Sequence, residues 1–175
     1  MLLNINPQRS YIYSAMVLLG CILLTVYTFN ETSLRLFSHW LIFDESYGHG
    51  LLVLATCIYM IHCALAAGEI YSSGPDWFML LPLLLCSFTL ALSVVAGIDM
   101  VQYILLPAVV FISFYLVAGR NAAIRILIPL GLIYFAIPFW DHFTNGLLAL
   151  TSGVVQEMVY LSGITAYISG NSIYI

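Results

Sequence analysis

The stretch WFMLLPLLLCSFTLALSVVA, residues 77–96, is twenty residues long and contains no charged side chain. An α-helix rises about 1.5 Å per residue, so a run of this length matches the roughly 30 Å hydrocarbon core of a lipid bilayer. The stretch therefore predicts a membrane-spanning helix, and the remaining segments are best interpreted by comparison with it.

The composition of the whole chain agrees with a membrane location. Of the 175 residues, 63% are hydrophobic and only 7% are charged, whereas about 25% of the residues in a soluble domain are charged. The chain lacks the charged surface that a soluble domain needs, so we predict an integral membrane protein in contact with the lipid bilayer. Its length predicts a single transmembrane domain, residues 1–175.

Further apolar runs on both sides of residues 77–96 predict an all-α, polytopic helix bundle. The additional expected spans are residues 11–29, 50–67, 100–117 and a shorter run, 124–139. Five spans are therefore expected. Residues 143–161 carry a polar stripe at helical spacing, which fits an amphipathic interfacial helix, a re-entrant segment or a span facing a wet cavity.

The few cations indicate an orientation and exclude one class of partner. The chain has no lysine, and its net charge is −4, so it offers no basic surface for nucleic acid. With the N-terminus inside, Arg9, Arg120 and Arg125 are cytoplasmic and only Arg35 is outside. Because cytoplasmic loops are enriched in arginine and lysine, this multi-pass orientation is favoured over its reverse.

With that orientation, polar residues gather on the outer side. They lie in the loop expected over residues 30–49, at the tight turn containing Asp99, and in residues 138–143. Polar groups at a membrane boundary need water or a function, so we predict an outward-facing site there. Its candidate lining residues are Trp40, Asp44, Glu45, Tyr47, His49, Asp141 and His142, with Gly48 and Gly50 as positions of close approach.

Structural roles remain open for several of these residues. Trp40 and Trp140 suit an aromatic belt at the headgroup level. Asp44, Glu45 or Ser46 would serve equally well as caps for the helix that follows, whose first N–H groups lack partners. Each acid taken singly is explained by capping or by solvation.

His49 is the most distinctive candidate. It lies at the expected start of a helix between Gly48 and Gly50, which allow another segment or a substrate to approach closely. The positive end of the helix dipole disfavours an imidazolium, so a neutral His49 is expected to make a hydrogen bond in a partly dry site. A purely structural role is the alternative.

No metal or cofactor is predicted. Histidines and acids of the outer side are metal-ligand types, but no HxxxH or HExxH spacing is present. The four cysteines all fall in apolar runs without a CxxC pair, which is typical of small buried hydrophobic residues. They are Cys21, Cys57, Cys63 and Cys86.

Several motifs in consistent order resemble the exosortase/archaeosortase family. The stretch DESYGHGLLVL, residues 44–54, resembles the family's acidic-aromatic loop and Tyr-Ser-His-Gly helix start, with Gly48 replacing the serine. The stretch AGRNAAIRILIPLGLIYFAIPFWD, residues 118–141, resembles its basic turn and its helix ending in Ile-Pro-aromatic. The stretch LSGITAYISGNSIYI, residues 161–175, resembles its Gly-Ile-x-Ala segment and a short strand-like end.

The resemblance implies an activity and a cellular location. Members of the family are multi-span enzymes of the bacterial or archaeal cytoplasmic (inner) membrane, thought to act as cysteine transpeptidases. Their substrates are membrane-anchored proteins with a C-terminal sorting signal: a Pro-Glu-Pro-like motif, a membrane helix and a basic tail. The processed proteins pass to the envelope or to a secreted polysaccharide matrix.

The family's catalytic Cys, Arg and His have no counterpart among the 175 residues. In the family the cysteine follows shortly after the strand-like piece, so the chain is expected to be an N-terminal portion, truncated or degenerate, without transpeptidase activity by itself. The leading hypothesis is an exosortase-like protein in sorting-signal processing. Rivals are a non-enzymatic scaffold or substrate-binding subunit of an envelope or polysaccharide-export system, and a small transporter.

Overall fold

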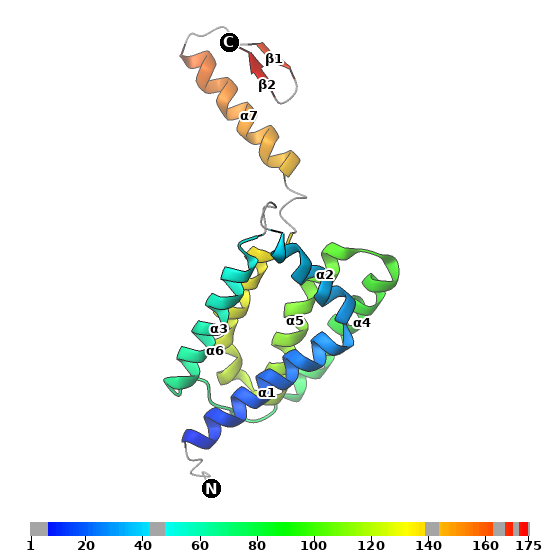
Figure 1. Cartoon of the computed structure of the whole chain (residues 1–175), viewed down its shortest axis with the longest axis vertical. Helices are drawn as coiled ribbons and strands as arrows, with labels where there is room; N and C mark the ends of the chain where they lie inside the picture. The colour runs from blue at the N-terminus through cyan, green and yellow to red at the C-terminus, as the bar shows by residue number, and fades with distance from the viewer. Residues whose placement is uncertain (1–6, 43–47, 139–143, 163–166, 170–171, 175) are drawn as a thin grey trace. The chain divides into compact units, whose positions relative to one another are not determined.

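A computed structural model describes residues 7–42, 48–138, 144–162, 167–169 and 172–174 (Figure 1). The chain forms two compact units, Met1–Pro138 and Phe139–Ile175. Each unit is described by itself below.

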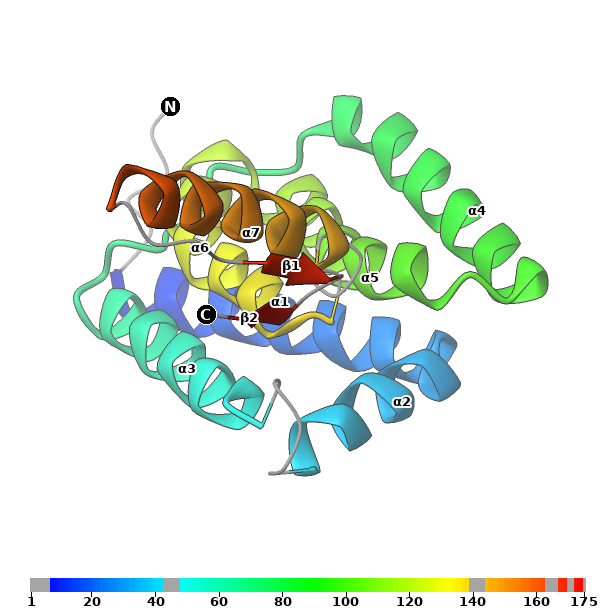
Figure 2. The same ribbon diagram turned by 90° about the horizontal axis from the view of Figure 1, so that it is seen from above.

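The first unit is a helical bundle. Its elements are α1 (Pro7–Thr28), α2 (Asn30–Leu41), α3 (Gly50–Ala66), the 3₁₀ helix η1 (Trp77–Met79), α4 (Leu80–Ala96), α5 (Asp99–Ala118), α6 (Arg120–Leu132) and the 3₁₀ helix η2 (Ile133–Ala136). Figures 1 and 2 show α3 and α4 on opposite sides of this bundle.

The described residues of the second unit form one helix and two short paired strands. Helix α7 covers Thr144–Leu161, and strands β1 (Tyr167–Ser169) and β2 (Ser172–Tyr174) pair antiparallel, with Ile168 opposite Ile173. The helix corresponds to the polar-striped stretch 143–161 of the sequence.

Among the residues that the structure describes, two helical segments are long and apolar enough to cross a membrane by themselves. They are Trp77–Ala96, which joins η1 and α4, and Asp99–Ala118, which is α5. A third span results if Ile12–Thr28 and Asn30–Leu41 count together, although these helices meet at 99°. Gly50–Ala66 is a shorter apolar helix. Membrane-spanning helices are thus confirmed, whereas five separate spans are not.

Residues 30–41 differ from the sequence-based expectation. They were predicted as part of an outer loop, but the structure folds them into α2. The apolar residues of α2 are divided between two faces, and polar residues separate them, so no continuous apolar run marks the helix in the sequence. The prediction of a loop over residues 30–41 is therefore wrong.

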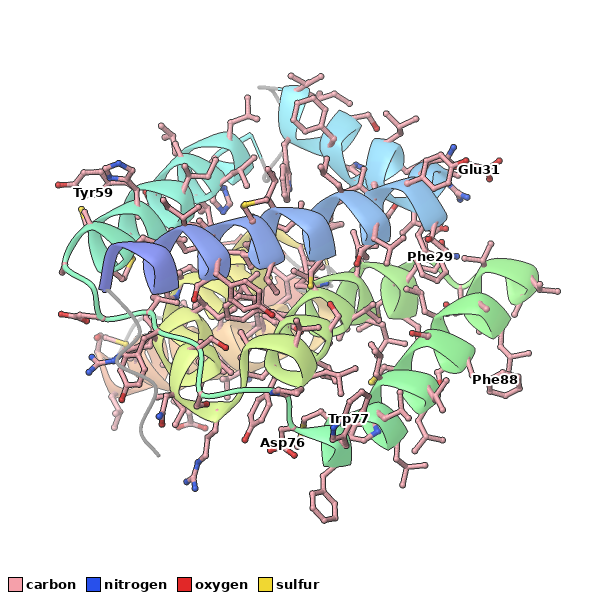
Figure 3. The ribbon with its side chains drawn as sticks, turned by 90° about the horizontal axis from the view of Figure 1, so that it is seen from below. Phe29, Glu31, Tyr59, Asp76, Trp77 and Phe88 are labelled. Atoms are coloured by element: carbon pink, nitrogen blue, oxygen red, sulfur yellow. The ribbon has the colours of Figure 1, made fainter. Side chains whose placement is uncertain are left out.

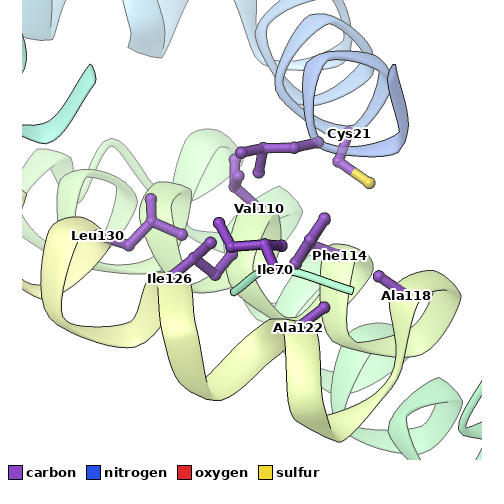
Figure 4. Close-up of a cluster of buried hydrophobic side chains, with 9 residues drawn as sticks. Cys21, Ile70, Val110, Phe114, Ala118, Ala122, Ile126 and Leu130 are labelled. Atoms are coloured by element: carbon purple, nitrogen blue, oxygen red, sulfur yellow. The ribbon is translucent and has the colours of Figure 1, made fainter. Parts of the chain in front are cut away.

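The core of the bundle lies around α5. Phe114 and Ala118 of α5 are fully buried against Ala122 and Ile126 of α6, and Cys21 of α1 belongs to the same cluster (Figure 4). Small alanine side chains let helix backbones approach closely, which is how helices pack where water supplies no driving force. Figure 3 shows Tyr59 and Phe88 projecting outward from the bundle, and both are well exposed, as lipid-facing residues are.

The cysteines only partly follow the sequence-based interpretation. Cys21 and Cys57 are buried, but Cys86 is half-buried and Cys63 is exposed. The Cys57 thiol donates a hydrogen bond to the Pro129 carbonyl oxygen at 2.9 Å, which joins α3 to α6. The prediction that all four cysteines are buried is therefore wrong for Cys63.

Ion pairs mark the two ends of α5. Arg35 contacts Asp99, the first residue of α5, at 2.9 Å. Arg125 contacts Glu69 at 3.1 Å, and it lies in the helix that follows the end of α5 at Ala118. Because α5 has 20 residues, about 30 Å separates its ends. The two pairs therefore lie near opposite boundaries of the predicted bilayer.

Candidate functional site

Trp40 is held at the end of α2 by the buried face of that helix. Thr32, Leu36 and Trp40 follow each other at intervals of four residues and are all buried, so they share one helix face. The Trp40 indole Nε1–H donates a hydrogen bond to the Ala136 carbonyl oxygen at 2.7 Å. This bond fixes the end of α2 against η2, 96 residues later in the chain.

Gly50 lets α3 begin directly against the Trp40 ring. A Cβ atom at Gly50 would overlap the indole carbons Cδ1 and Cγ of Trp40. Gly50 itself is buried. The absence of a side chain therefore allows the close approach of α2 and α3.

His49 lies at the N-cap position of α3 and binds the residue before Ala136. Its Nε2 atom lies 3.2 Å from the Phe135 carbonyl oxygen, and the side chain is exposed. A carbonyl oxygen only accepts hydrogen bonds, so Nε2 is the donor in this contact. The contact holds the His49 ring against the end of η2 at the surface of the unit.

Both contacts satisfy backbone groups at a helix end. The last carbonyl groups of a helix lack intrahelical donors, and η2 is followed by extended Ile137 and then by Pro138, which has no N–H. Trp40 and His49 supply the donors for Ala136 and Phe135. We call this arrangement of Trp40, His49, Gly50 and the two η2 carbonyls the Trp40–His49 junction.

A buried polar network lies where α2 meets α5, further along the buried face of α2 that carries Trp40. The Thr32 hydroxyl donates to the Gln102 Oε1 atom at 2.8 Å, and the Gln102 amide donates to the Ser93 carbonyl oxygen at 3.1 Å. Its second acceptor is Asp99 at 3.4 Å. Asp99 is therefore engaged by Arg35 and Gln102, and its carboxylate serves to anchor α2.

The junction contains some of the site residues predicted from the sequence, and others lie outside the described residues. Trp40, His49 and Gly50 lie together, and Gly48 is half-buried next to them. Five further candidates lie outside the described residues: Asp44, Glu45, Tyr47, Asp141 and His142. Within the described part of the chain, no group of three histidine, cysteine, aspartate or glutamate side chains is placed to hold a metal ion.

Sequence reasoning missed the partners that complete the junction. Main-chain carbonyl oxygens of Phe135 and Ala136 carry no sequence signature. Gln102, which belongs to the buried polar network and not to the junction, did have a sequence signature, because an amide in an otherwise apolar predicted span needs a buried hydrogen-bond partner.

The sequence model of a protein family described as transmembrane exosortase matches residues 39–175. The chain belongs to the transmembrane exosortase family. The matched region begins one residue before Trp40, so it contains the whole Trp40–His49 junction of this exosortase-family protein. No curated protein and no solved structure matches the chain.

The junction gives this exosortase-family chain a defined polar group at one end of its bundle. The exposed His49 imidazole presents a polar ring at the surface of the unit, with its Nε2–H bound to the Phe135 carbonyl oxygen. The buried indole and Gly50 fix where that imidazole stands. The arrangement is suited to binding and orienting a polar group of another molecule, whereas no nucleophile is part of it.

Proposed function

We propose that the chain takes part in the processing and sorting of membrane-anchored proteins with C-terminal sorting signals. In this proposal the Trp40–His49 junction forms part of the surface that binds these proteins. Family membership supports the general activity. The proposed position of the binding surface rests on one observation: residues of α2 and of the start of α3 both bind adjacent carbonyl groups of η2. Three separated stretches of the family-matched region meet there.

In this proposal His49 binds and orients the polar motif that precedes the substrate's membrane helix. Asp44, Glu45, Tyr47, Asp141 and His142, which lie outside the described residues, remain lining residues of this site as the sequence predicts. The covalent step of transpeptidation requires an activated nucleophile, and no residue of this chain is assigned that role. The proposal also includes the five-span bundle with the N-terminus inside, which would place the junction on the outer face of a bacterial or archaeal cytoplasmic membrane.

Photocrosslinking in bacterial membranes tests this proposal. A benzophenone amino acid replaces Ile42, which is 45% exposed beside Trp40, or Tyr59, which is 68% exposed in the middle of α3. A reporter protein carries a Pro-Glu-Pro-like motif, a membrane helix and a basic tail. We expect a crosslink from position 42 that disappears when the motif is scrambled, and none that depends on the motif from position 59.

A matched pair of histidine substitutions isolates the junction. His49→Ala should lower the yield of the position-42 crosslink several-fold, while His62→Ala, at an exposed position of the same helix, should leave it unchanged. Equal yields in both variants at equal protein levels would contradict a substrate role for His49. Because no residue of this chain is assigned as a nucleophile, crosslinking is expected without cleavage of the reporter, and cleavage by this chain alone would contradict that assignment.

A further inference from the structure

Helix α2 presents three different faces. Thr32, Leu36 and Trp40 face the protein and are buried. A second face is apolar and exposed, and it consists of Leu34, Phe37 and Leu41, which are 67%, 41% and 50% exposed. A third face is polar and exposed, and it consists of Glu31, Arg35 and Ser38. A helix at the boundary between lipid and water requires such a division of its exposed surface.

The geometry of α2 does not suit a membrane crossing. It contains 12 residues, which span about 18 Å and so fall well short of the hydrocarbon core. It meets α1 at 99°. If α1 crosses the bilayer, α2 consequently runs along the bilayer surface.

Contacts with α5 fix the level of α2 along the bundle. Arg35 binds Asp99, the first residue of a helix long enough to span the membrane. Thr32 binds Gln102, one turn further along α5. Because the end of a spanning helix lies near the headgroups, these two contacts hold α2 at that level.

The exposed apolar face of α2 is continuous with the lipid-facing surface of the bundle. A groove of about 400 Å³ runs between α1, α2 and α5. Val26, Leu34, Phe37, Trp40 and Leu106 contribute to its apolar lining. A groove without charged residues, joined to a spanning helix through Leu106, is suited to lipid acyl chains.

We propose that α2 is an interfacial helix that lies flat in one headgroup boundary of the bilayer. Leu34, Phe37 and Leu41 contact acyl chains, which also fill the groove, and Glu31, Arg35 and Ser38 contact water. The helix thereby sets the depth of the Trp40–His49 junction at the membrane surface. This inference concerns the position of α2 and does not depend on the proposed substrate.

Spin labels measure this arrangement in the full chain reconstituted into nanodiscs of phosphatidylethanolamine and phosphatidylglycerol. Single cysteines replace residues of α2 in a background without the four native cysteines, which is accepted only if its helix content and melting match the native chain. A high collision rate of the spin label with oxygen indicates that the label lies in lipid. A high collision rate with a water-soluble nickel chelate indicates that the label lies in water. Labels at Leu81, Leu85, Phe88 and Leu92 of α4, all exposed, calibrate depth in the same protein.

We expect labels at positions 34, 37 and 41 to favour oxygen and labels at 31 and 38 to favour nickel. The depths of the labels in the bilayer at positions 34, 37 and 41 should differ by less than the rise of one helical turn. Along α4 the depth of the labels should change steadily. A steady change of depth along α2 would show that it enters the bilayer and would overturn the proposal. So would low accessibility to both reagents at 34 and 37, because a protein partner would then cover that face.

A second measurement leaves the native cysteines in place. A benzophenone amino acid at Leu34 should crosslink to radiolabelled phospholipid at a yield at least several-fold above that from Ser38. Equal yields at the two positions would contradict the assignment of the faces.

Discussion

At the scale of single residues, the close contact between Gly50 and the Trp40 ring predicts that a larger side chain at position 50 destabilises the protein. Gly50→Ala should lower the free energy of unfolding by about 1–3 kcal/mol, because the new methyl group would overlap the buried Trp40 ring. Reversible unfolding in mixed detergent micelles, followed by circular dichroism, measures this change.

Gly131→Ala is the matched control, because this helical glycine in α6 has open space where the Cβ would lie. It should leave stability unchanged or raise it by about 0.5–1 kcal/mol, since alanine favours the helix. If Gly50→Ala behaves like Gly131→Ala, the contact between α3 and the indole is not as described.

The Trp40 indole N–H supports a second prediction. Trp40→Phe keeps an aromatic ring but leaves the Ala136 carbonyl oxygen without the donor that now lies at 2.7 Å. Leaving a buried acceptor unpaired costs about 1–3 kcal/mol, so the thermal midpoint should fall by several degrees. Trp77→Phe, at a position 71% exposed, should not change it, and equal effects of the two substitutions would refute the role of the hydrogen bond.

At the scale of elements, the contact between Thr32 and Gln102 joins α2 to α5. Gln102→Leu removes the acceptor for the buried Thr32 hydroxyl and the donor to Ser93, so it should destabilise the chain by about 1–3 kcal/mol. Thr32→Val removes the other partner. Because the two side chains share a bond, the double variant should lose clearly less than the sum of the single losses.

A double-mutant cycle of unfolding free energies checks this coupling. Strict additivity would contradict a direct interaction between Thr32 and Gln102, and the attachment of α2 to α5 would then rest on other contacts such as that of Arg35 with Asp99. The cycle therefore measures the coupling free energy of the buried Thr32–Gln102 contact apart from the contribution of the exposed ion pair.

The element boundaries show what the sequence reveals and what it does not. Residues 77–96 and 100–117 were predicted as spans and appear as helical segments within a residue of those limits, because an uncharged run of that length has few other stable structures in a membrane. The prediction of a loop over residues 30–41 failed because the apolar residues of α2 are divided between protein and lipid. A helix with two separate apolar faces has a mixed polar and apolar sequence, which resembles that of a loop.

The candidate site shows the same limit in a different form. His49 and Gly50 are conspicuous in the sequence because polar and flexible residues are scarce in this chain. Their partners are main-chain carbonyl oxygens of Phe135 and Ala136, more than eighty residues away. Such partners depend on how α6 ends in η2, and only the three-dimensional structure shows where that end lies.

At the scale of the whole molecule, the distribution of arginine between the two ends of the bundle predicts an orientation in the membrane. Arg35 and Asp99 lie at one end of α5, whereas Arg125 and Glu69 lie beyond the other end. The excess of arginine at the second end favours placing it in the cytoplasm. The segments that contain Asn30 and Gly97 should then face outward, and those that contain Ser73 and Gly119 should face inward.

Reporter fusions after these four residues test the orientation. Alkaline phosphatase, which is active only outside the cytoplasm, should be active after Asn30 and Gly97, and a fluorescent protein that folds only inside should fluoresce after Ser73 and Gly119. The alternation follows because α3 would return the chain after α2 has run along the surface, and α4 and α5 would each cross once. Fusions after Asn30 and Ser73 on the same side would exclude a crossing by α3, and an inactive phosphatase after Asn30 would exclude the placement of the Trp40–His49 junction on the outer face.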